Sequence, residues 1–188
     1  TIHIALAPAF AANLAATLAN RGWYRLPHFV RDLGGNGKPS GLGIRQETGV
    51  DPRHFDPVVE AMRDVVDQPS GTGRRARIDG IAVCGKTGTV QDEPRKDHSV
   101  FIAFAPMDDP QIALSVYVEN SGFGGEWAAP IAALLIEQYL TGEVSSVARL
   151  NRILDADLSD PYPEPEEKSA EETATDVPMT ELPVTDAQ

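Results

Sequence analysis

The 188-residue chain has few of the side chains on which several classes of protein depend. Cysteine occurs once, as Cys84, which excludes an internal disulfide and any metal site built from several thiolates. His3, His28 and His54 have no cysteine or carboxylate at ligand spacing, so neither a metal nor another cofactor is expected. No run approaches the roughly 18 consecutive apolar residues of a membrane span, and the N-terminus lacks the pattern of a secretory signal.

Basic side chains are also scarce, with 16 against 28 acidic ones and a formal net charge of −12. Phosphate binding needs clustered Lys and Arg, so nucleic acid is excluded as the main partner. Eleven of the acids lie in residues 155–188, together with five prolines and one lysine. Such a segment cannot bury enough apolar surface to offset its ordering entropy, which predicts an acidic, Pro-rich disordered tail. Residues 1–154, with 17 acids and 15 bases, form the expected folded part.

The first predicted helix covers residues 8–20. Pro8 suits its first turn, and Phe10, Leu14 and Leu18 recur at a spacing of four, which places them on one face of the helix. The segment that follows, from residue 23 to residue 31, is aromatic and β-rich but contains a proline, which favours an extended edge segment.

A glycine-rich loop is expected over residues 33–43, before a second helix over residues 56–67. Asp56 is expected to cap this helix, and Pro57 suits its first turn. Its expected buried face consists of Val58, Val59, Met62, Val65 and Val66.

Three strands are predicted over residues 81–87, 100–105 and 112–118. The connections are too short for crossover helices, so the strands are expected to form an antiparallel meander. Residues 127–140 predict a helix that is apolar almost all round and is therefore sandwiched between the sheet and another element. The expected fold class is α+β, with helices packed on an antiparallel sheet.

The chemistry centres on Lys86, for which two interpretations compete. Residues 80–87 satisfy the phosphate-binding pattern G-x-x-x-x-G-K-[ST]. However, the residues between the two glycines favour a strand rather than a loop, and Gly88 and Pro94 discourage the helix that must follow. Nucleotide binding is therefore the weakest alternative.

In the second interpretation, the Lys-Thr-Gly-Thr sequence of residues 86–89 lies on an edge strand that borders a cleft. There an ammonium group and two hydroxyls hold a carboxylate, while a strand N–H faces a developing oxyanion. Gly88 lacks a side chain, so a substrate backbone can lie against the strand.

The surroundings of Lys86 make this interpretation specific. The sequence GIAVCGKTGTVQDEPRKDHSVFIAFAP, followed by IALSVYVENSGFGGEWAAPIAALLIEQYL, closely resembles the C-terminal part of class B penicillin-binding proteins. It is most similar to the elongation-type penicillin-binding protein 2, a peptidoglycan D,D-transpeptidase. The resemblance extends upstream through Gly71-Thr-Gly73 and the helix before it, and covers roughly residues 7–154.

The resemblance implies roles for four residues. Lys86, Thr87 and Gly88 match the family's Lys-Ser/Thr-Gly motif, and Lys86 would supply positive charge near the nucleophile. Thr87 and Thr89 would bind the terminal carboxylate of a D-Ala-D-Ala stem peptide or of a β-lactam. The backbone N–H of Thr89 would be one of two oxyanion donors. Lys86 and Thr89 are thus the predicted catalytic residues.

The chain departs from the family at two other motifs. None of its nine serines is followed by Lys three residues later, as in the nucleophile motif Ser-x-x-Lys, or by Asn two residues later, as in Ser-x-Asn. Residues 1–7 also replace the polar, Gly-containing segment expected there. These departures predict a C-terminal piece of the transpeptidase domain that is inactive alone. The alternative is a truncated, non-catalytic interaction module of the same family.

The resemblance also implies partners and a location. The expected partners are the stem peptide, β-lactams, the rest of the same transpeptidase domain and a membrane glycosyltransferase. The expected location is the periplasmic side of the bacterial inner membrane, with the membrane anchor outside this sequence.

Other polar residues are given structural roles. Cys84 is expected to be a small buried side chain, and His98 to make a structural hydrogen bond rather than to act as an acid or base. The basic cluster is expected to be a solvated face: Arg74, Arg75 and Arg77.

Overall fold

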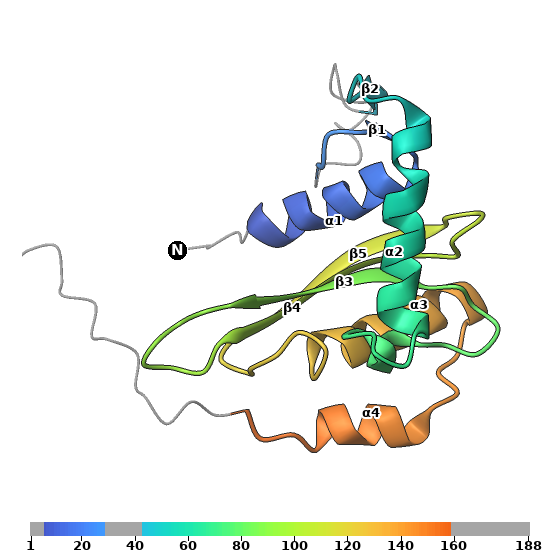
Figure 1. Ribbon diagram of the computed structural model, residues 1–188. Helices are drawn as coiled ribbons and strands as arrows, with labels where there is room; N and C mark the ends of the chain where they lie inside the picture. Colours follow the sequence, from blue (N-terminus) through green and yellow to red (C-terminus); the bar gives the residue numbers. More distant parts are fainter. Residues whose placement is uncertain (1–5, 29–42, 159–188) are drawn as a thin grey trace, which may run out of the picture.

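The computed structural model describes residues 6–28 and 43–158, and its centre is a three-stranded antiparallel sheet (Figure 1). The strand order is β3 (Cys84–Val90), β4 (His98–Ala105) and β5 (Ile112–Val118), so the predicted meander is confirmed. The third strand has the predicted bounds, whereas β3 begins and ends three residues later than predicted. The reason is pairing: Gly88, Thr89 and Val90 lie opposite residues of β4, while Ile81 forms only an isolated bridge.

Helices cover both faces of this sheet. Helix α1 (Leu6–Ala19) packs mainly against β5, and α2 (Asp56–Asp67) packs against β3, on the same face. Helix α3 (Ala128–Thr141) packs on the opposite face, and α4 (Val147–Leu154) lies beyond α3. The expected α+β class, with helices packed on an antiparallel sheet, is confirmed.

Short elements connect these layers. Strand β1 (Trp23–Tyr24) pairs with β2 (Gln46–Glu47), so the predicted extended segment is found at its beginning. The 3-10 helices η1 (Pro52–His54) and η2 (Arg74–Ala76) lie on either side of α2 in the sequence. The predicted loop over residues 33–43, apart from Gly43, and the predicted tail from residue 159 onward lie outside the described residues.

The apolar core has two parts, one on each face of the sheet. The larger part, between the sheet and α3, includes Val83, Phe101, Ala103, Ala132 and Ile136. The smaller part, under α1 and α2, consists of Ala19, Val59, Met62, Cys84 and Phe104. Alternate residues of β3 and β4 therefore bury opposite faces of the sheet, as the period of two in a strand requires.

The large apolar residues on one face of α1 are mostly exposed, and its buried apolar residues are alanines. Phe10 is 62% exposed and Leu14 is 53% exposed, whereas Ala15 and Ala19 are buried. Alanines let the helix approach the sheet closely, and the large side chains at the intervening positions then point away from it.

The start of α2 also differs from the prediction. The residue before the helix is Phe55, and no side chain caps the helix; Asp56 lies in its first turn. The capping carboxylate is found instead at Asp51, which accepts a hydrogen bond of 3.1 Å from the backbone N–H of Arg53 in η1. Val59, Met62 and Val66 are buried as predicted, but Val58 is 44% exposed.

Helix α3 is largely buried, as its composition predicts, but Leu135 and Tyr139 are exposed. Gly142 ends the helix in the left-handed conformation, with φ of 83°. Helix α4 was not predicted, although Ser146 provides its cap by accepting from the N–H of Arg149. Among the described residues, no helix is both long and apolar enough to span a membrane.

Candidate functional site

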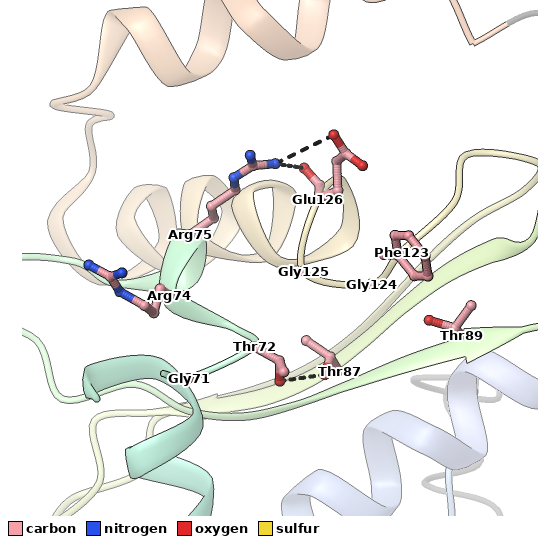
Figure 2. A pocket seen from close by; sticks show the side chains of 10 residues that line it. All are labelled: Gly71, Thr72, Arg74, Arg75, Thr87, Thr89, Phe123, Gly124, Gly125 and Glu126. Carbon is pink, nitrogen blue, oxygen red and sulfur yellow. Dashed lines mark hydrogen bonds and ion pairs between the residues drawn. The ribbon is translucent and has the colours of Figure 1, made fainter. Parts of the chain in front are cut away.

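The side chains of Thr87 and Thr89 lie on the same face of β3 and line a pocket of about 490 Å³ (Figure 2). Strand alternation places both hydroxyls on the α3 face of the sheet. Because β3 is an edge strand, alternate backbone N–H groups on it also point away from β4. The remaining lining residues come from the segment after α2 and from the loop after β5: Gly71, Thr72, Arg74, Arg75, Phe123, Gly124, Gly125 and Glu126.

Lys86 is not brought into this pocket. Its side chain is exposed on the face of β3 that also carries Cys84, and its Nζ donates a 2.7 Å hydrogen bond to the carbonyl oxygen of Thr87. The four predicted site residues are therefore consecutive on one strand, but only the two threonines share the pocket. The catalytic and binding roles predicted for Lys86, Thr87, Gly88 and Thr89 stay predictions.

The backbone of the loop after β5 lies close to Gly88, but the glycine that permits this approach is Gly124, since a Cβ atom at Gly88 would come no nearer than 3.4 Å to Val100. A Cβ atom at Gly124 would lie 2.4 Å from the carbonyl oxygen of Gly88 and 2.3 Å from that of Val100. A Cβ at Gly125 would lie 2.1 Å from the carbonyl oxygen of Thr72. Gly124 lets the loop after β5 lie directly on the sheet, Gly125 lets it lie against the segment after α2, and both glycines line the pocket.

Ser99 holds that loop in place. Its side chain is fully buried, and its Oγ donates to the carbonyl oxygen of Phe123 and accepts from the N–H of Ala128, both at 3.0 Å. Ser99 is paired with Thr89 across the two strands, so the anchor lies directly beside the pocket. The hydroxyl thus joins the sheet, the loop and the first turn of α3.

A second hydroxyl contact crosses the pocket wall. The Oγ1 atoms of Thr72 and Thr87 are 2.8 Å apart and share a hydrogen bond, as Figure 2 shows. Thr72 belongs to the segment between α2 and η2, fifteen residues before its partner. One of the two predicted carboxylate-binding hydroxyls therefore has a fixed neighbour inside the protein.

The charges around the pocket are mixed. Arg75 donates a 3.3 Å hydrogen bond to the carbonyl oxygen of Glu126, and its guanidinium lies 3.8 Å from the Glu126 carboxylate. Arg152 of α4 also approaches this carboxylate at 3.8 Å and lies over the ring of Trp127. Arg74, Arg75 and Arg77 are exposed, as the predicted solvated face requires, and Arg74 and Arg75 also line the pocket.

The structural roles predicted for Cys84 and His98 are confirmed. Cys84 is fully buried, and burial raises the pKa of its thiol to about 12, which keeps it protonated and unreactive. His98 accepts a 3.0 Å hydrogen bond from the N–H of Asn120 through Nδ1, and its Nε2 lies 3.6 Å from Asp92. In the described part of the chain, no three His, Cys, Asp or Glu side chains are grouped to hold a metal ion.

The phosphate-loop alternative is inconsistent with the local backbone. Gly85, Lys86 and Thr87 are extended and paired with β4, and no helix follows them. A phosphate-binding loop needs N–H groups that curve round an anion at the start of a helix. Residues 80–87 therefore match the phosphate-loop sequence pattern but do not have the phosphate-loop conformation.

Sequence reasoning missed most of the pocket wall. Thr72 and Ser99 act through contacts that span 15 to 29 residues, and their sequence neighbourhoods do not specify these partners. The only sequence signals of this wall were the glycines on either side of Thr72 and the double glycine of the loop after β5. Glycines of this kind mark close backbone approach, although they do not identify the neighbour.

Comparison with known proteins identifies the family. The family model of the penicillin binding protein transpeptidase domain matches residues 2–137. Peptidoglycan D,D-transpeptidase PbpA of Mycobacterium tuberculosis is 35% identical over 152 residues, which is 74% of this chain and 30% of PbpA. Peptidoglycan D,D-transpeptidase MrdA of Acinetobacter baumannii is 32% identical over 191 residues, 90% of this chain and 28% of MrdA.

Solved structures agree with the sequence comparisons. Penicillin-binding protein 2 of Pseudomonas aeruginosa superposes with a TM-score of 0.59 at 33% identity, over 69% of this chain and 28% of that one. Penicillin-binding protein A of M. tuberculosis, as its imipenem acyl-enzyme complex, gives 0.57 at 32% identity, over 75% and 32%.

The chain belongs to the penicillin-binding protein transpeptidase family, and its relatives include members of class B. The resemblance found in the sequence is thereby confirmed. The chain spans less than a third of the length of PbpA and of MrdA.

Proposed function

We propose that this chain supplies the carboxylate-binding part of a serine-type peptidoglycan D,D-transpeptidase. The observation that carries the proposal is the placement of two adjacent threonine hydroxyls, those of Thr87 and Thr89, in one pocket on an edge strand. Hydroxyl donors and outward-facing strand N–H groups are the groups that an acyl-transfer site needs for a carboxylate and an oxyanion.

The reaction would be acyl transfer in two steps. A serine Oγ attacks the carbonyl carbon of the penultimate D-Ala of a stem peptide, the peptide bond breaks, and the terminal D-Ala leaves with the serine proton on its amine. An amine of a second stem peptide then attacks the acyl-enzyme ester, which forms the cross-link and returns the proton to the serine. A β-lactam acylates the same serine through its ring carbonyl, and penicillin-binding protein A of M. tuberculosis forms an acyl-enzyme complex of this kind with imipenem.

Each predicted residue has a place in this scheme. Thr87 and Thr89 hold the terminal carboxylate of the substrate, and the N–H of Thr89 stabilises the oxyanion together with the N–H of the serine. Lys86, on the other face of β3, supplies positive charge toward a nucleophile carried by residues that are not in this sequence.

The pocket wall favours a ligand whose end is anionic. Two arginines and one glutamate line it, so its formal charge is positive by one. The exposed ring of Phe123 lies across from Thr89 and offers an apolar contact beside the hydroxyls, suited to the methyl group of an alanine side chain (Figure 2).

The same proposal includes the partners and the location of the whole protein. Its partners would be stem peptides ending in D-Ala-D-Ala, β-lactams, the nucleophile-bearing rest of the domain and a membrane glycosyltransferase. It would act on the periplasmic side of the bacterial inner membrane. The family and its relatives, which are named peptidoglycan D,D-transpeptidases, support the stem peptide and β-lactam as ligands.

Intact-mass spectrometry after incubation with benzylpenicillin tests the proposal. We expect no adduct on the 188-residue chain, because none of its serines is in a Ser-x-x-Lys motif. A version extended upstream through the serine and lysine of that motif is expected to gain one penicillin per chain. Thr87→Val and Thr89→Val in the extended version should slow acylation about tenfold or more, because each removes a donor to the ligand carboxylate.

The control is an Ala substitution of the nucleophilic serine in the extended version, which must abolish the adduct. An adduct on the short chain itself would contradict its proposed inactivity. If neither version reacts, the non-catalytic interaction module becomes the better description.

A further inference from the structure

The hydroxyl groups of Thr72 and Thr87 form a hydrogen bond at the pocket. The Lys-Thr-Gly-Thr motif does not explain this contact, because Thr72 lies outside the motif. Its Oγ1–Oγ1 distance of 2.8 Å is that of a normal hydroxyl–hydroxyl hydrogen bond. The two residues belong to different elements, and both line the pocket (Figure 2). The contact therefore links the segment after α2 to the ligand-facing side of β3.

The backbone around Thr72 is held on three sides. A Cβ at Gly71 would lie 2.3 Å from the carbonyl oxygen of Val65, so this segment lies directly against the last turn of α2. The N–H of Gly73 donates a 2.9 Å hydrogen bond to the same carbonyl group. The carbonyl oxygen of Thr72 lies under Gly125, where even one methyl group would be only 2.1 Å away. The Thr72 hydroxyl is therefore presented to β3 from a rigid support.

The direction of the shared hydrogen bond decides what Thr87 can offer a ligand. Each hydroxyl has one hydrogen and two acceptor lone pairs. If Thr87 donates to Thr72, it has no hydrogen left for a carboxylate. If Thr72 donates to Thr87, the hydrogen of Thr87 is free to point at the ligand, and the two bonds in series strengthen each other.

We propose that Thr72 is a positioning residue that orients the hydroxyl of Thr87 as a hydrogen-bond donor and thereby makes the pocket selective for a carboxylate-terminated ligand. This inference rests on the proposed function. A carboxylate is a pure acceptor, and its hydrogen bonds are charge-assisted, so it gains most from a pre-oriented donor. A terminal carboxamide is neutral and brings donors of its own, so it gains less from the same arrangement.

Ligand titrations of the 188-residue chain test this inference. The two probes are N-acetyl-D-Ala-D-Ala and its C-terminal carboxamide, followed by the amide NMR signals of β3. In the wild-type chain, the carboxylate is expected to bind severalfold more tightly than the carboxamide. Thr72→Val keeps the shape but removes the donor, and should weaken carboxylate binding about fivefold to tenfold while carboxamide binding changes less than twofold.

Thr72→Ser retains the hydroxyl and should restore the preference to within about twofold of the wild type. The matched control is Thr141→Val, because the Thr141 hydroxyl also makes hydrogen bonds but lies at the end of α3, outside the pocket lining. This variant should leave the preference unchanged.

The outcomes separate the two proposals. A wild-type chain that binds neither probe, or binds both equally, would overturn the proposed carboxylate site, and the role of Thr72 with it. A wild-type preference that survives in Thr72→Val overturns the role of Thr72 alone. Equal loss of both ligands in Thr72→Val, or no rescue by Thr72→Ser, shows a structural role only and also overturns it.

Discussion

At the residue scale, Ser99 shows how one buried hydroxyl supports a whole wall of the pocket. Its Oγ is the hydrogen-bond partner of the carbonyl group of Phe123 and of the N–H of Ala128. Both groups belong to the end of the loop after β5, where the chain enters α3. Without the hydroxyl, two backbone groups beside a fully buried side chain would lose their partner, and unpaired buried groups are costly.

We predict that Ser99→Ala lowers the free energy of unfolding by about 1–3 kcal/mol. The loop should also open more often, so hydrogen exchange at the N–H of Ala128 should accelerate. Both effects are measured on the version extended upstream, by urea unfolding and native-state hydrogen exchange, because a free energy of unfolding requires a cooperative transition. Ser70→Ala, at an exposed position, is the matched control and should change stability by less than about 0.5 kcal/mol. Unchanged exchange at Ala128 in Ser99→Ala would show that the loop is held by other contacts.

The sequence predicted the candidate site only in part. It identified the residues of the local motif but not the residues whose contacts are distant in the sequence. Thr87 and Thr89 were found because a short motif and strand alternation together place them on one face. Ser99 and Thr72 were not found, because their partners are set by how the sheet, the loop and α2 pack together. Lys86 shows the limit of a motif: adjacent positions on a strand face opposite sides.

At the element scale, α3 joins the sheet to the outer helix α4. Its composition predicted a helix buried on most sides, and its bounds were correct to within one residue. The exposed Leu135 and Tyr139 mark the part of its surface that is not covered by the sheet or by α4. The sequence did not predict α4, because a helix of eight residues has little periodicity to detect.

The C-terminal end of α3 can be tested by substitution of Gly142. Gly142 has φ of 83° and no neighbouring atoms where a Cβ would stand, so a substitution there meets only backbone strain. We predict that Gly142→Ala lowers the free energy of unfolding of the version extended upstream by about 1 kcal/mol, measured by urea titration. Gly142→Asn should cost less, because Asn tolerates the left-handed conformation better. Equal stability of the Ala variant and the wild type would show that residue 142 does not adopt the left-handed conformation at the end of α3.

Strand β3 shows why element boundaries were less predictable than element order. Local preference favoured the apolar residues 81–83, whereas Gly88 is a poor strand former and marked the expected end of the strand. The observed strand nevertheless runs through Val90, since β4 supplies a pairing partner for each of its residues. Tertiary pairing therefore overrides local propensity at the place where the site is built.

At the scale of the whole molecule, the described residues leave the outer edge of β5 and part of the surface of α1 without a covering element. Strand β5 pairs only with β4, so its outer edge presents unpaired backbone groups. Helix α1, which packs over β5, exposes Phe10 and Leu14. Unpaired strand edges and exposed apolar side chains are both places where another chain can bind.

We therefore predict that the isolated 188-residue chain self-associates and unfolds over a broad, weakly cooperative thermal transition. Sedimentation velocity should show a mass that rises with concentration, and the double variant Phe10→Ser/Leu14→Ser should lower it. Leu135→Ser/Tyr139→Ser is the matched control, because it removes two exposed apolar side chains from the opposite face of the sheet and should leave association unchanged. The version extended upstream should be monomeric with a sharper and higher transition, because more of the transpeptidase domain can then cover α1 and β5. A soluble short chain that remains monomeric and melts cooperatively at ordinary temperatures would show that these surfaces need no cover.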